Sequence, residues 1–191
     1  PSSGAIAIGQ ILGMLQHTPA SLMSPPTEAV DGTPDPRWLH LYTEASRLAF
    51  ADRALYVADP DFAPAPSGEW QSLLAPAYLR ERAKLIRPTA MPQALPGVPV
   101  RAQRSSFAPM VEQPEYGTSH ISIVDGYGNA LAMTTTIEDA FGSRQMVKGF
   151  LLNNELTDFS FAPRDAQGRL VANRVQPNKR PRSSMSPTLV F

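Results

Sequence analysis

The residue with the clearest chemical potential is Thr118, which follows Gly117 where a proline-rich tract meets a strongly β-forming segment. A threonine hydroxyl is a weak nucleophile by itself. An N-terminal threonine carries its own base, because its α-amino group has a pKa of about 7.7–8.0 and lies beside the hydroxyl. Cleavage before Thr118 would therefore create a nucleophile at the start of a strand. Composition alone favours the ordinary alternative, a threonine that simply begins a strand.

Two acidic residues three positions apart, Glu155 and Asp158, lie in a polar segment that follows a short apolar stretch. On one loop, two carboxylates at this spacing can hold a single ammonium group. A charged hydrogen bond of this kind contributes about 1.5–3 kcal/mol. The pattern taken alone is more typical of solvated loop acids, so both interpretations stay open.

Other motifs give little support for a metal, phosphate or anion site. The histidines His17, His40 and His120 lack metal-ligand spacing, and the sequence contains neither an HExxH motif nor an Asp-rich calcium loop. Residues 126–129 (GYGN) lie between two strand-like segments and predict a hairpin turn rather than a phosphate loop. The basic run 179–182 is typical of a solvated loop, with an anion site as the alternative. We expect neither a metal ion nor a cofactor.

The overall composition excludes several classes of partner. The 191 residues are 42% hydrophobic and 18% charged, which is typical of a chain that folds around an ordinary core. Seventeen basic residues balance 17 acidic ones, so no net field attracts nucleic acid or an anionic membrane surface. No apolar run approaches the roughly 18 residues that a transmembrane helix needs. The absence of cysteine excludes disulfides and thiolate metal sites.

Helical patterns dominate the first half of the chain. Residues 2–16 carry apolar side chains at helical spacing behind two serines that could cap the first turn. An aspartate–proline pair begins a second helix over 35–59, and a third is expected from 76 to about 86. Residues 18–34 are expected to form a loop, and 87–114, with six prolines, a linker. Because the first helix begins without a lead-in, we expect further residues upstream.

Strand patterns dominate the second half. Residues 119–124 and 130–137 are β-compatible and flank a turn at 125–129, which predicts a hairpin. Short strands are also expected at 149–152 and 186–191. Helices followed by strands predict an α+β fold rather than alternating βαβ units.

A series of motifs in a fixed order extends along most of the chain. Downstream they are 118–125 (TSHISIVD), 128–130 (GNA), 134–137 (TTTI), 141–142 (FG), 151–155 (LLNNE), 158–160 (DFS) and 177–188 (PNKRPRSSMSPT). These segments resemble the start of the small subunit of γ-glutamyltranspeptidases. Upstream, 1–4 (PSSG), the helix 39–53 and 59–62 (DPDF) resemble the end of the large subunit.

This resemblance implies an N-terminal-nucleophile hydrolase with an αββα sandwich, made as a precursor that cuts itself. Residues 1–117 would form the C-terminal part of the large subunit, and 118–191 the N-terminal part of the small subunit. The cleavage site would be the Gly117–Thr118 bond. On the family pattern Thr118 is the nucleophile, and Thr136 is the second threonine that hydrogen-bonds to it and activates it.

The resemblance also assigns substrate-binding residues. Glu155 and Asp158 would hold the α-ammonium group of the substrate, and Ser183 and Ser184 its α-carboxylate. The sequence departs from the family where an asparagine is usual two residues after the second threonine. Glu138 stands there and adds a negative charge near the ammonium pocket.

Other departures concern packing and completeness. Ala5 stands where a second glycine is usual, and the loop after 141–142 is about two residues shorter than expected. The family's oxyanion glycine pair and its carboxylate-binding arginine fall outside these 191 residues. Since one oxyanion donor contributes about 3–4 kcal/mol to transition-state stabilisation, we expect these residues alone to be nearly inactive.

The sequence thus predicts transfer or hydrolysis of γ-glutamyl groups from glutathione-like amides through an ester on Thr118. The acceptor would be water, an amino acid or a peptide amine. A glutaryl or cephalosporin-type acylase of the same superfamily is the alternative, and an uncleaved, non-catalytic binding relative is a third possibility. The expected partners are these small molecules and the two subunits of one precursor, without nucleic acid or a membrane span. The family pattern implies a periplasmic or secreted location.

Overall fold

A computed structural model describes residues 2–18, 35–114 and 117–190 of the chain. Its helices are α1 (Gly4–Leu15), α2 (Pro36–Tyr56) and α3 (Pro76–Ala83), with short 3₁₀ turns η3 (Pro66–Gly68), η4 (Trp70–Leu74) and η5 (Glu155–Asp158). Its strands are β1 (Ser119–Val124), β2 (Ala130–Thr135), β3 (Met146–Val147) and β4 (Phe150–Leu151). Apart from Thr18, the predicted loop 18–34 lies outside the described residues.

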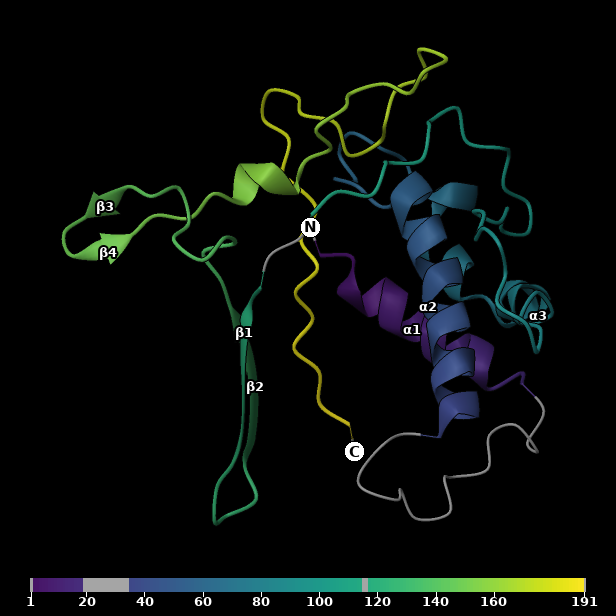
Figure 1. The fold of residues 1–191 in the computed structure, drawn as a ribbon, viewed down its shortest axis with the longest axis horizontal. Coiled ribbons are helices and arrows are strands. Elements are labelled where there is room, and N and C mark those ends of the chain that lie inside the picture. Colours follow the sequence, from purple (N-terminus) through teal and green to yellow (C-terminus); the bar gives the residue numbers. More distant parts are fainter. Residues whose placement is uncertain (1, 19–34, 115–116, 191) are drawn as a thin grey trace.

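The helices form one side of the molecule, with α1 crossing α2 and α3 packed beside them (Figure 1). Their shared core contains Met14, Leu48 and Leu79, all at most 5% exposed. The side chain of Asp35 caps α2 by accepting from Arg37 N–H, as its position before proline predicts. The three expected helices are therefore confirmed, and the third ends about three residues earlier than predicted.

A buried carboxylate joins the helices. Asp52 of α2, 1% exposed, accepts from Gln10 of α1 at 2.8 Å and from Tyr78 of α3 at 2.7 Å. It also accepts from Arg82 at 3.2 Å and from Gly97 N–H at 2.8 Å. A buried charge needs partners of this kind, so Asp52 fixes the relative positions of three helices and the segment that follows them.

The interpretation of residues 87–114 as a linker is wrong. The segment packs along α2: Met91 N–H donates to Glu44, and Tyr56 donates to the carbonyl of Gly97. Further on, Met110 N–H donates to the carbonyl of Ala54. The prolines set an extended backbone, but buried acceptors on α2 take up its hydrogen bonds, which a proline count could not reveal.

The β1–β2 hairpin is antiparallel, with Ser119 opposite Thr135 and Val124 opposite Ala130. It extends away from the helices in Figure 1, and Ile123 and Leu131 are about half exposed. A two-stranded hairpin is at best marginally stable in water, so these apolar side chains are ones that a larger sheet would cover. The described residues agree with an α+β fold, and the predicted sandwich stays a prediction.

The expected strand at 186–191 is wrong as far as the described residues reach. Residues 186–190 form no strand, and Phe191 lies outside the described part of the chain. A bridge between Ser2 and Ser183 is the only ladder contact formed nearby among described residues. The β-branched pattern alone does not make a strand, because a strand also requires a partner.

The interpretation of the basic run as a solvated loop is wrong for Lys179 and Arg182, whereas the side chain of Arg180 is 57% exposed. Lys179 and Arg182 are buried and donate to backbone carbonyls, including those of Arg53 and Val57 at the end of α2. Burial lowers the pKa of Lys179 to about 8. Arg180 pairs with the buried carboxylate of Asp59 at 2.6 Å and holds the pKa of that carboxyl below its ordinary value. The basic run therefore anchors this segment to the helices.

Candidate active site

A cavity of about 360 Å³ lies between α1, the β1–β2 hairpin, η5 and the segment 183–186. It collects the predicted nucleophile, its activator and the predicted substrate-binding residues: Thr118, Thr136, Glu138, Glu155, Asp158, Ser183 and Ser184. Gly117, on the other side of the predicted cleavage site, is exposed. Residues that are up to 66 positions apart in the chain are thus brought to one place.

The two threonines meet at the open end of the hairpin. Extending its register by one pair places Thr118 opposite Thr136, and their Oγ1 atoms are 3.2 Å apart in a hydrogen bond. The N–H of Glu138 donates to the same Thr136 oxygen at 2.8 Å. Thr136 is therefore held in place while its hydroxyl remains in contact with Thr118. Such a contact can orient the Thr118 oxygen for attack.

Three carboxylates face this cavity. Glu155 and Asp158 come from η5, which follows the β3–β4 hairpin, and Glu138 follows β2. Burial raises the pKa of Glu155, and the negative charge of Glu138 raises it further, whereas a hydrogen bond with Asp158 lowers it. Carboxylates placed this close repel one another, so a bound ammonium group would relieve the repulsion.

Glu138 has an unusual backbone. Its φ of +73° lies in the left-handed region, and its side chain is 8% exposed and accepts from Asn154 Nδ2. Asparagine tolerates this region better than glutamate does, which gives a physical reason for asparagine at this position on the family pattern. The Glu138 backbone geometry supports Thr136 through the N–H donor, while its side chain adds charge to the pocket.

The serine pair is held by the N-terminus of α1. Ser3 N–H and Ser3 Oγ each donate to the carbonyl of Ser183 at 2.9 Å, and Ser2 Oγ donates to the carbonyl of Met185. The Ser183 hydroxyl accepts from Met185 N–H at 3.1 Å. Ser3 stands at the N-cap position as expected, but its side chain makes no cap bond and holds Ser183 instead.

Replacing Gly4 with alanine should destabilise this contact. A Cβ at Gly4 would lie 2.4 Å from Ser186 Cβ and 2.8 Å from the carbonyl oxygen of Ser184, so the segment must shift. We expect a loss of about 1–3 kcal/mol in unfolding free energy. Thermal unfolding of the full-length protein measures it. Ala5→Ser, which also adds one heavy atom but on an exposed position, is the matched control, and equal effects of the two changes would refute the packing argument.

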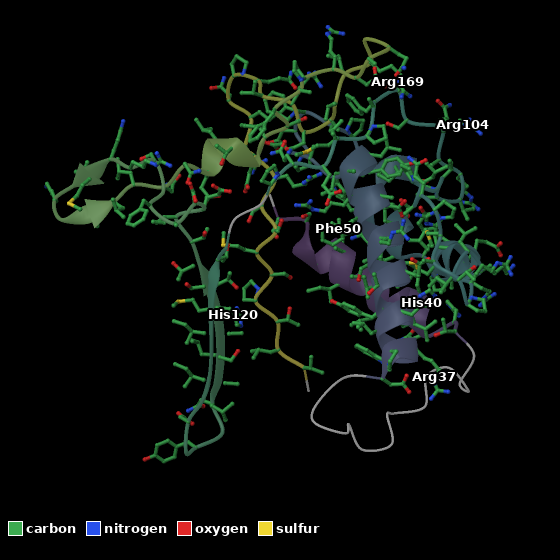
Figure 2. All side chains as sticks on the ribbon, in the orientation of Figure 1. Arg37, His40, Phe50, Arg104, His120 and Arg169 are labelled. Atoms are coloured by element: carbon green, nitrogen blue, oxygen red, sulfur yellow. The ribbon has the colours of Figure 1, made fainter. Side chains whose placement is uncertain are left out.

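Two residues of the cavity, His120 and Thr134, are not among the site residues that the sequence predicts. Both line the cavity, and His120 Nδ1 is 2.8 Å from Thr134 Oγ1 while Nε2 is 3.1 Å from Ser122 Oγ. Figure 2 shows His120 on the hairpin. The available signal was the period of two: His120 follows Thr118 by two positions and Thr134 precedes Thr136 by two, so all four share a face.

Across residues 2–18, 35–114 and 117–190, no cluster of three or more His, Cys, Asp or Glu side chains could hold a metal ion. None of the helices described has the length and apolarity to cross a bilayer.

Comparison with known proteins identifies the family. Residues 1–191 match the family model described as gamma-glutamyltranspeptidase. The chain belongs to the γ-glutamyltranspeptidase family. It is 39% identical over 196 residues to the glutathione hydrolase proenzyme of Pseudomonas aeruginosa, covering 100% of this chain and 31% of that protein. It is 32% identical over 194 residues to the acylase ACY 1 proenzyme of Pseudomonas sp. strain SE83, covering 100% of this chain and 29% of that protein.

A solved structure shares the fold of this γ-glutamyltranspeptidase-family chain. It is the cephalosporin acylase from Bacillus halodurans, with a TM-score of 0.59 and 22% identity over 96% of this chain and 27% of that one. The chain spans about a third of the length of the curated relatives that it matches.

Proposed function

We propose that the protein containing this chain transfers or hydrolyses γ-glutamyl groups of glutathione-like amides through an ester on Thr118. The observation that carries the proposal is the 3.2 Å contact between the hydroxyls of Thr118 and Thr136 in a cavity that also contains carboxylates and a serine pair. The family match supports the same reaction. No cofactor is needed for it.

Maturation would come first. In the continuous chain the Thr118 nitrogen is an amide, so it cannot act as a base. Attack of Thr118 Oγ1 on the Gly117 carbonyl carbon forms an ester and breaks the C–N bond, which releases the α-amino group. Water then hydrolyses the ester and leaves a carboxylate on Gly117. Within these residues the cut gives segments of 117 and 74 residues, which belong to the large and small subunits.

Turnover would use the same oxygen. Thr118 Oγ1 attacks the γ-carbonyl carbon of the donor while the free α-amino group takes the hydroxyl proton. That proton passes to the leaving amine as the amide bond breaks. Water, an amino acid or a peptide amine then attacks the γ-glutamyl ester, and the Thr118 hydroxyl is restored. Thr136 orients the oxygen in both steps.

Recognition would divide between the two ends of the donor's amino-acid group. Glu155 and Asp158 hold its α-ammonium, with Glu138 adding charge beside them, and Ser183 and Ser184 donate to its α-carboxylate. The raised pKa of Glu155 fits this role, because a cation bound beside three carboxylates would restore the ionised form.

The deciding experiment compares γ-glutamyl-p-nitroanilide with glutaryl-p-nitroanilide as substrates of the full-length protein. A clear preference for the γ-glutamyl donor supports the proposal, since a glutaryl group has no ammonium for the acidic pair to bind. A preference for the glutaryl compound favours the acylase alternative, which is supported by the 32% identity to an acylase proenzyme. An intact Gly117–Thr118 bond and no turnover would favour a non-catalytic binding relative.

Thr136→Ala should slow chemistry more than it weakens substrate binding. The Thr136 hydroxyl contacts Thr118 and Glu138 N–H, so its removal leaves the nucleophile poorly oriented. We expect kcat to fall about tenfold or more with a smaller change in KM. Steady-state kinetics with γ-glutamyl-p-nitroanilide measure both. An unchanged kcat with a raised KM would make Thr136 a binding or packing residue.

The proposed setting follows the family pattern. The large and small subunits of one precursor are the protein partners, and a γ-glutamyl donor with water or an amine acceptor is the small-molecule set. A periplasmic or secreted location fits this activity. Fractionation of cells that express the full-length protein tests the location.

A further inference from the structure

A buried arginine contacts the predicted carboxylate-binding serines. Arg53 lies in the last turn of α2 and is 8% exposed. Its Nη2 donates to Ser184 Oγ at 2.6 Å, and its Nε donates to Ser3 Oγ at 2.9 Å. The Phe50 ring lies 5.2 Å from the guanidinium carbon. These contacts fix the guanidinium in one orientation.

Ser3 connects Arg53 to Ser183, the other serine of the pair. It is 1% exposed, accepts from Arg53, and donates from both its N–H and its hydroxyl to the carbonyl of Ser183. The backbone of Ser183 and the side chain of Ser184 are therefore both positioned by the Arg53–Ser3 pair. Ser184 is exposed and lines the cavity, whereas Arg53 reaches it from the helical side.

The direction of the hydrogen bond to Ser184 has a chemical consequence. A hydroxyl has one proton to donate, and Ser184 Oγ is already an acceptor from a cation. Its own proton therefore points away from the guanidinium. A hydroxyl that accepts from a charged donor is also polarised into a stronger donor. Both effects favour donation from Ser184 to an anion in the cavity.

We propose that Arg53, acting through Ser184 and Ser3, is a positioning residue for recognition of the donor's α-carboxylate. This inference rests on the proposed γ-glutamyl activity. Arg53 and Ser3 precede the Gly117–Thr118 bond, and Ser184 follows it. After cleavage the contact joins two separate chains, so carboxylate recognition depends on how the large-subunit part holds the small-subunit part.

The test uses two donors that differ only in the α-carboxylate, γ-glutamyl-p-nitroanilide and 4-aminobutanoyl-p-nitroanilide, with the full-length enzyme. Arg53→Gln should lower kcat/KM for the γ-glutamyl donor by tenfold or more, mainly through KM. The loss on the 4-aminobutanoyl donor should be less than threefold. Arg47→Gln, on the same helix but bonded to Glu44 and the Met91 carbonyl, is the matched control and should leave the ratio of the two donors unchanged.

Two further variants separate positioning from folding. In a Ser184→Ala background, Arg53→Gln should cause little additional loss on the γ-glutamyl donor, because both changes remove the same contact. Ser3→Ala, which leaves Arg53 in place, should reproduce a smaller carboxylate-specific loss if Arg53→Gln does not fold. Equal losses on both donors, or additive losses in the double variant, would overturn the role of Arg53. A wild-type enzyme that shows no preference for the γ-glutamyl donor would instead overturn the proposed function on which this role rests.

Discussion

Thr118→Ala in the full-length precursor will abolish both cleavage at the Gly117–Thr118 bond and turnover of γ-glutamyl donors. Alanine has no hydroxyl to attack either carbonyl, and without cleavage the α-amino base never forms. Denaturing gels report the cleavage, and γ-glutamyl-p-nitroanilide hydrolysis reports turnover. The effect is the largest that the proposed mechanism predicts, since every step passes through one oxygen atom.

Matched variants show whether the hydroxyl itself matters. Thr118→Ser keeps a hydroxyl and should still mature and turn over, although more slowly. Thr135→Ala removes the neighbouring threonine of β2, which is exposed and points to the opposite face of the hairpin, and should behave like the wild type. If Thr118→Ala still matures and hydrolyses the donor, the nucleophile is another residue.

The second large effect is expected at the acidic pair. Asp158→Asn and Glu155→Gln should each reduce kcat/KM for γ-glutamyl-p-nitroanilide by about tenfold to a hundredfold, because one charged hydrogen bond to the ammonium group contributes about 1.5–3 kcal/mol. Glutaryl-p-nitroanilide, which has no ammonium, should lose much less. Paired kinetics on the two anilides measure the difference.

The third carboxylate of the cavity, Glu138, is tested by Glu138→Asn. The variant removes one carboxylate from the cavity and places asparagine at a φ of +73°, which asparagine tolerates better, so we expect no loss of stability. The wild type should prefer the γ-glutamyl donor over the glutaryl one more strongly than Glu138→Asn does. Equal losses on both substrates in all three variants would mean that these acids support the fold, and the acylase interpretation would replace ours.

Local patterns in the sequence predicted most of the secondary structure. The cap at Asp35, the apolar spacing of the helices and the turn before β2 depend on neighbours a few residues away. The turn is an example: Asp125 accepts from Tyr127 N–H and Asn129 N–H, as a short polar loop between strands favours. Such interactions can be inferred without knowledge of the fold.

The errors arose where partners are distant in sequence. The proline-rich segment is held by Glu44 and Asp52 of α2, and the basic residues Lys179 and Arg182 donate to carbonyls that only the folded chain brings near. Residue type alone does not predict whether a charged residue or a proline-rich segment is exposed, because a hydrogen-bond partner far along the chain can offset the cost of burying it.

The predicted site residues came mainly from the family resemblance, and their gathering around one cavity came from the structure. Pattern alone suggested Thr118 and the pair at 155 and 158 but favoured ordinary interpretations of them. The contribution of Arg53 could not be predicted, because its contact with Ser184 spans 131 positions in the sequence.

The most direct test of the central claim uses the smaller polypeptide of the purified full-length protein. Its N-terminal sequence and mass are measured before and after a brief reaction with γ-glutamyl-p-nitroanilide that is then quenched. Our account predicts a polypeptide that begins at Thr118, and that gains the mass of one γ-glutamyl group on its first residue when quenched. A single uncut chain, or a γ-glutamyl group attached to any other residue, would contradict it.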